Sequence, residues 1–99
     1  MLTLPETATV LEKVAQTLDT SEEAALKAGL RTLLQRNLRA VRSQIFEITG
    51  RYDVTGVEEM DARYREGSLD EATSWRDLQT LDHLEYQRDQ LKALLDLLP

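Results

Sequence analysis

The sequence contains no cysteine, one histidine, two prolines and four glycines among 99 residues. The absence of cysteine excludes a disulfide framework, a thiol nucleophile and a cysteine-ligated zinc site. A single histidine, His83, is too little for a histidine-based metal site or catalytic array. No stretch approaches the roughly 20 apolar residues of a membrane span, and we expect no signal peptide. We therefore expect no catalysis, no metal or cofactor, no small-molecule ligand and no membrane insertion.

The composition is that of a small domain with a charged surface. Apolar residues make up 41% of the chain and charged residues 30%, with a net charge of −6 and a mass of 11.3 kDa. Residues 1–99 therefore form one predicted domain. A chain of this size buries only about two-thirds of its unfolded surface. We therefore predict that the chain assembles as a homodimer, which buries more of its apolar surface, and that it is located in the cytoplasm.

Helix starts recur along the chain as a Ser/Thr-x-x-Glu pattern. In this capping box, the hydroxyl and the Glu side chain satisfy backbone N–H groups that the first turn leaves free. The four copies are Thr3–Glu6, Thr20–Glu23, Thr55–Glu58 and Ser68–Glu71. Gly50 and Gly67 stand where helices would end. The pattern predicts helices near 4–18, 21–49, 56–66 and 69–98.

The two long segments carry matching leucine seams at helical spacing. The first seam consists of Leu26, Leu30, Leu34, Leu38, Val41, Ile45 and Ile48; the second consists of Leu81, Leu84, Leu91, Leu95 and Leu98. Equal lengths and matched seams favour an antiparallel pair. The predicted fold is all-α: two long antiparallel helices joined by a short corner helix, with a short N-terminal helix, dimerising into a helical bundle.

Charge is distributed unevenly along the chain. Residues 21–52 hold six basic and three acidic groups, a net +3, whereas residues 53–99 hold five basic and twelve acidic groups, a net −7. One antiparallel register would bring basic groups of the first long helix opposite acidic groups of the second. Such exposed ion pairs fix the relative orientation of the two helices but contribute little to the stability of the fold. The predicted ion pairs of this register are Arg31 with Asp89, Arg39 with Asp82 and Arg42 with Asp77.

The basic flank of the same helix has a second interpretation. Lys27, Arg31, Arg39 and Arg42 could contact a DNA backbone, in which case binding would weaken steeply with salt. The overall acidic charge weakens this alternative.

Four aromatic residues gather in the sequence around the predicted bend: Phe46, Tyr52, Tyr64 and Trp75. They either form a small core that seals the end of the helical pair or anchor a partner protein, because Trp and Tyr often carry the binding energy of an interface. Both interpretations stay open at this point.

Two family resemblances follow from particular stretches. Leu4-Pro5-Glu6, Leu18-Asp19-Thr20-Ser21-Glu22-Glu23 and Ala28-Gly29-Leu30-Arg31-Thr32-Leu33-Leu34 look like the helices of a ribbon-helix-helix repressor, but the few residues before Pro5 hold no Arg or Lys that could contact base edges.

Residues 20–98 more closely resemble small all-helical prokaryotic antitoxins of toxin–antitoxin pairs. The stretches that carry this resemblance are Arg36-Asn37-Leu38-Arg39, Ile45-Phe46-Glu47, Gly50-Arg51-Tyr52-Asp53-Val54, Val57-Glu58-Glu59-Met60, Glu66-Gly67, Ser74-Trp75-Arg76-Asp77 and Leu81-Asp82-His83-Leu84-Glu85. The resemblance implies a cytoplasmic chain that binds and neutralises a toxin encoded nearby.

Three functions therefore follow from the sequence. The first is a non-catalytic antitoxin that acts by protein–protein contact. The second is a DNA-binding transcriptional regulator that uses the N-terminal helix pair and the basic flank. The third is a structural oligomerisation protein.

Overall fold

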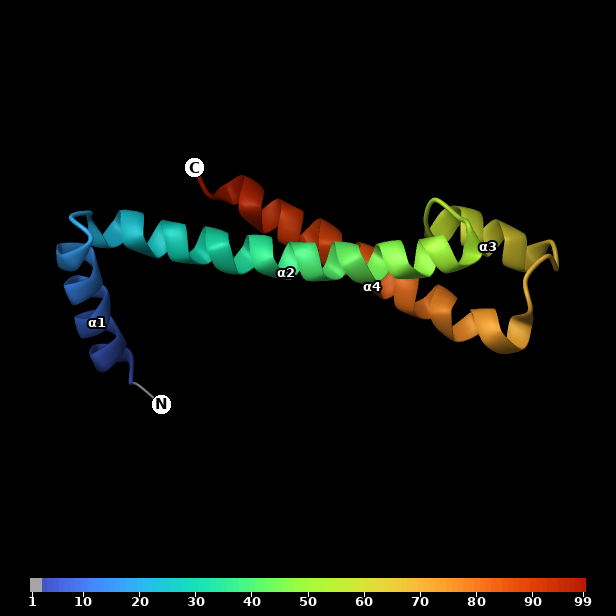
Figure 1. Ribbon diagram of the computed structural model, residues 1–99, viewed down its shortest axis with the longest axis horizontal. Helices are drawn as coiled ribbons and strands as arrows, with labels where there is room; N and C mark the ends of the chain where they lie inside the picture. The colour runs from blue at the N-terminus through green and yellow to red at the C-terminus, as the bar shows by residue number, and fades with distance from the viewer. Residues whose placement is uncertain (1–2) are drawn as a thin grey trace.

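The computed structural model describes residues 3–99, and within them the chain forms four helices and no strand (Figure 1). These helices are α1 (Leu4–Thr17), α2 (Glu22–Tyr52), α3 (Val57–Arg65) and α4 (Glu71–Leu97). Their bounds agree with the four predicted ranges to within three residues. The all-α prediction is confirmed.

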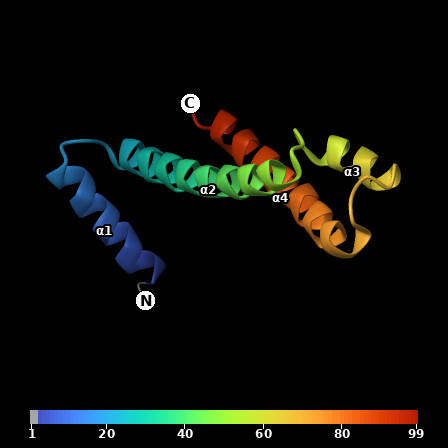
Figure 2. The same cartoon turned by 45° about the vertical axis from the view of Figure 1, so that its right-hand side comes forward.

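The helices form an elongated molecule of 60 × 28 × 17 Å. Helices α2 and α4 run in opposite directions and cross, and α3 turns the chain between them at one end (Figure 1). At the other end α1 diverges from α2, and this divergence persists when the molecule is turned (Figure 2). The predicted corner helix and antiparallel pair are thus both present.

The hydrophobic core lies toward the α3 end of the molecule. Its buried residues are Val41, Ile48, Val54, Met60, Leu78, Leu81 and Leu84. Met60 and Leu81 are fully buried, so α3 is attached to the α2–α4 pair by its apolar face. Ser74 is also fully buried, and its hydroxyl donates to the carbonyl of Asp70 at 2.6 Å, which satisfies the polar group.

The two leucine seams are only partly used. Leu38, Val41 and Ile48 are buried against α4, but Leu26 and Leu30 are 51% and 42% exposed. These two residues of the predicted seam stay exposed because the C-terminal end of α4 stops short of the first turns of α2 (Figure 1).

One of the four predicted capping boxes forms as expected. The backbone N–H of Glu6 donates to the Thr3 hydroxyl, and the Glu6 carboxylate accepts from the Thr3 N–H. At α2 the cap is Ser21 and not Thr20, and at α4 it is Asp70 and not Ser68. Ser and Asp are both favourable N-cap residues, and the Ser68 hydroxyl instead donates to the carbonyl of Arg63.

A side chain from another helix accepts the hydrogen bond at the start of α3. Its N-cap is Gly56, which has no side chain to accept a hydrogen bond. The carboxylate of Glu85 on α4 accepts from the backbone N–H of Val57 at 2.7 Å. The predicted partner of Thr55 was Glu58, but Thr55 donates its N–H and its hydroxyl to Glu59, at 3.0 and 2.8 Å.

The helix ends correct one prediction and confirm another. Gly50 lies inside α2, which continues to Tyr52 and ends at Asp53 in the left-handed conformation, with φ of 52°. Asp is one of the few residues other than Gly that adopt this conformation readily. Gly67 follows α3 with φ of 77°, as expected of a residue that stops a helix.

Candidate protein-binding surface

A groove of about 350 Å³ runs between α3 and α4. Its floor is apolar, and acidic side chains stand along its edges. The lining residues are Val57, Glu58, Asp61, Trp75, Leu78, Gln79 and Asp82. We call this feature the α3–α4 groove.

Trp75 is the largest side chain in the groove and is 49% exposed. Its ring centroid lies 5.6 Å from that of Tyr64, with the two planes tilted by 40°. This contact is in the range of favourable aromatic pairs, and about half of the Trp75 surface stays open to solvent. The arrangement suits an interface anchor.

The edges of the groove are negative. Asp61 forms an ion pair with Arg65 at 3.0 Å, but across residues 3–99 neither Glu58 nor Asp82 has an ion-pair partner. A cation placed over Trp75 would gain from the ring and from these carboxylates together. The groove is therefore complementary to a positively charged side chain.

Tyr52 belongs to a hydrogen-bond network and not to the aromatic pair. Its hydroxyl donates to Asp77 at 2.5 Å, and Arg51 donates to the same carboxylate oxygen at 2.7 Å. The hydrogen bond to Asp77, with burial as a smaller cause, raises the pKa of Tyr52 above 10.0. The same carboxylate raises the pKa of Arg51. Asp77 thus joins the last turn of α2 to α4.

The structure separates the four aromatic residues that the sequence places near the bend. Tyr64 and Trp75 meet, and Tyr52 and Tyr64 pack on the edge of the core. Phe46 is 78% exposed and contributes nothing to a small core. Phe46 is close to the bend in the sequence. Its position in the sequence does not reveal that its side chain is exposed and not packed against α4.

The predicted register of charges is wrong. Asp77 pairs with Arg51 and not with Arg42, nine positions earlier on α2. Arg31 donates to the carbonyl of Pro99 at 2.9 Å, and Asp89 accepts from its neighbour Arg88. In the part of the chain described here, the predicted pairs of Arg39 with Asp82 and Arg31 with Asp89 do not form.

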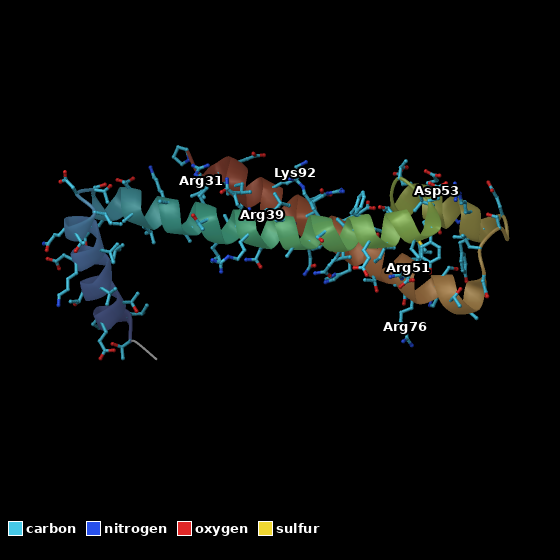
Figure 3. All side chains as sticks on the ribbon, in the orientation of Figure 1. Arg31, Arg39, Arg51, Asp53, Arg76 and Lys92 are labelled. Carbon is cyan, nitrogen blue, oxygen red and sulfur yellow. The ribbon has the colours of Figure 1, made fainter. Side chains whose placement is uncertain are left out.

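The basic residues proposed for DNA contact lie in different surroundings, and two of them, Arg31 and Arg39, are labelled in Figure 3. Lys27 pairs with Glu23 at 3.3 Å, and Arg31 reaches the end of α4. Arg39 and Arg42 lie beside a shallow hollow that Leu38 and Leu95 also line. The four side chains thus do not form one uninterrupted cationic surface.

Two further properties concern the described residues. They contain no group of three or more His, Asp or Glu placed to hold a metal ion. None of the helices in this part of the chain has the length and apolar character needed to cross a membrane.

The sequence matches the family described as "Uncharacterized protein MJ0235 family" over residues 2–98. The chain belongs to this family. No curated protein and no solved structure matches it. The match covers α1 to α4, so the MJ0235 family relationship includes both the α3–α4 groove and the diverging N-terminal helix.

Sequence reasoning missed several residues that form or support this surface. Glu58 and Asp61 line the groove, Leu78 forms its floor, and Glu85 fixes the start of α3 behind it. The sequence signal for Glu85 is indirect: Gly56 cannot cap α3 by its own side chain, which leaves the first N–H groups of α3 to another side chain or to water.

Proposed function

We propose that this chain is a non-catalytic protein-binding module: an antitoxin that binds and neutralises a cognate toxin in the cytoplasm, acting as a homodimer. The toxin assignment rests on the family resemblance of residues 20–98. The observation that carries the protein-binding role is the half-exposed Trp75 in the α3–α4 groove. Its ring contacts Tyr64, and Glu58 and Asp82 line the same groove.

The negative charge of residues 53–99, which we call the acidic half, favours a positively charged partner. Residues 53–99 carry a net −7, and three of their carboxylates line the groove. Complementary charge speeds the encounter of two proteins and selects among partners. A toxin whose active site is positively charged would be covered by this acidic half and anchored at Trp75.

Co-expression with the product of the adjacent gene tests the proposal. We expect that product to inhibit growth when expressed alone, and to co-purify with this chain and lose its toxicity when both are present. Failure to form a complex, together with failure to restore growth, contradicts the proposal.

Two substitutions locate the contact. Trp75→Ala removes the anchor, and Asp82→Lys reverses one charge beside it. Each is expected to weaken the complex by about 30-fold or more, because an interface anchor contributes about 2 kcal/mol. Phe46→Ala is the matched control, since Phe46 is an exposed aromatic residue that does not line the groove. Equal affinities for all three variants would place the contact elsewhere.

A DNA-binding role is the competing proposal. Arg39 and Arg42 support it, because both are exposed and neither forms an ion pair within residues 3–99. Salt-sensitive retardation of promoter DNA that is lost in Arg39→Ala/Arg42→Ala would favour this role over toxin binding.

A further inference from the structure

The end of the molecule opposite the core exposes a set of large apolar side chains. They come from α1 and from the first third of α2, near which α4 ends (Figures 1 and 2). The contact that the end of the chain makes there is the hydrogen bond from Arg31 to Pro99, just beyond α4. The apolar side chains are Val10, Val14, Leu18, Leu26, Leu30 and Leu33, each between 40% and 68% exposed. We call these six residues the apolar end.

A groove of about 460 Å³ lies at this end, between α1 and α2. Val14 and Leu18 line it from α1, and Leu33 lines it from α2, with small residues between them. In α1, Ala15 is the one buried residue among those described. The contact between α1 and α2 therefore leaves most of the apolar surface of both helices uncovered.

The isolated chain has more surface than a folded monomer of its mass. Its accessible surface is 7488 Å², whereas a monomeric protein of this mass exposes about 5,700 Å². Its radius of gyration is 19.7 Å, against about 12.6 Å for a compact domain of this length. The excess surface exceeds the roughly 800 Å² that each partner buries in a standard interface. A second chain could bury this excess.

Charge indicates which chain fits this end. In a two-fold symmetric dimer, the same surface of each copy meets itself, so a surface of one charge sign repels its own copy. Residues 3–36 hold five acidic and four basic groups, a net −1, whereas residues 53–99 carry −7. The apolar end is thus compatible with a second copy of itself, while the acidic half is not.

We propose that a second copy of this chain covers the apolar end, so that α1 and the first third of α2 from both protomers form a helical bundle. The acidic halves then point away from the interface, and each keeps its α3–α4 groove open. This inference rests on the homodimer of the proposed function but not on the toxin.

Light scattering coupled to gel filtration tests the inference on the full chain. The expected mass of the unaltered protein is twice 11.3 kDa. The variant Leu18→Glu/Leu33→Glu places two charges in the interface and should raise the dissociation constant by on the order of 100-fold or more, giving a monomer. Both side chains are at least half exposed in the single chain, so the monomer should remain helical by circular dichroism. Phe46→Glu is the control and should leave the dimer intact.

Each outcome decides a different part of the proposal. A monomeric unaltered protein at 100 μM contradicts the homodimer itself. A dimer that persists in Leu18→Glu/Leu33→Glu shows that another surface is used and overturns the inference alone. Monomerisation by Phe46→Glu as well would show that the effect is not specific to the apolar end. Loss of toxin binding in a variant that stays dimeric bears on the proposed function only.

Discussion

The carboxylate of Glu85, in the middle of α4, accepts a hydrogen bond of 2.7 Å from the backbone N–H of Val57, the first residue of α3. A negative group at this position satisfies a free N–H and interacts favourably with the positive end of the helix dipole. A Cβ atom at Gly56 would lie 3.1 Å from Glu85 Oε2. Glycine at position 56 thus allows the carboxylate to approach closely.

Glu85→Ala should therefore lower the free energy of unfolding by about 1 kcal/mol, the usual cost of losing a helix cap. Urea denaturation followed by circular dichroism measures the change. Asp96→Ala is the control, because Asp96 is an exposed acid on the same helix. Equal stability of the two variants would show that the Glu85 contact contributes nothing.

Asp77→Asn should bring the pKa of Tyr52 down toward its ordinary value of 10.0, because Asp77 is the main cause of its increase. A raised folded-state pKa means that this contribution to stability is complete below pH 10 and is lost as the pH rises through the folded pKa. Absorbance of tyrosinate during alkaline titration measures the midpoint. Tyr52→Phe identifies which transition belongs to Tyr52, and an unchanged midpoint in Asp77→Asn would contradict the assignment.

Glu59 should make the start of α3 sensitive to acid. Hydrogen bonds from the Thr55 hydroxyl and backbone hold the pKa of Glu59 below 4.5, with Arg63 as a smaller cause. A lowered folded-state pKa contributes stability above pH 4.5 that disappears as the pH falls through the folded value. Glu59→Gln should therefore reduce the loss of stability between pH 5 and pH 3. Glu58→Gln, its exposed neighbour, should leave that loss unchanged in the same series of denaturation curves.

Leu81→Ala should cost about 2–5 kcal/mol, because it removes a fully buried side chain where α3 packs on the long helices. Phe46→Ala should stay within about 0.5 kcal/mol, since its ring is mostly in solvent. Chemical denaturation of both variants gives the comparison. A small loss for Leu81→Ala would mean that the core near Met60 rearranges to fill the space.

Helix positions could be predicted from the sequence because their signals are local. Leucine spacing and the polar residues around each start, such as Thr3 and Ser21, act over one or two turns. Those signals tolerate errors of one residue, and for that reason Ser21 replaces Thr20 as a cap without moving α2.

The pairing of the long helices could not be predicted in the same way. A leucine seam repeats every three or four residues, so sliding one helix along the other by whole turns still places leucine on leucine. Charge then selected a plausible register in which Asp77 met Arg42. Contacts outside the seam distinguish the actual register. Arg51 and Tyr52 at the end of α2 both donate to Asp77 of α4. Met60 of α3 is buried in the core with Ile48 and Leu81.

The candidate site could be predicted only in part, because it too depends on how the helices pack. Trp75 and Tyr64 could be proposed from residue type alone, but their contact depends on where the short α3 folds back. Phe46 is also aromatic, but its side chain is 78% exposed.

The core lies toward one end of the molecule, and this position affects the order in which a single chain would unfold. The tight packing of the core surrounds Met60 and Leu81, whereas Ala15 is the one buried residue among those described in α1. Opening should begin at α1 and spread inward, because the regions with the fewest buried contacts have the lowest opening free energy. In the monomeric variant Leu18→Glu/Leu33→Glu, backbone amides of α1 should then exchange with deuterium far sooner than those of α3. Trp75 fluorescence of that variant should report only the final stage of unfolding.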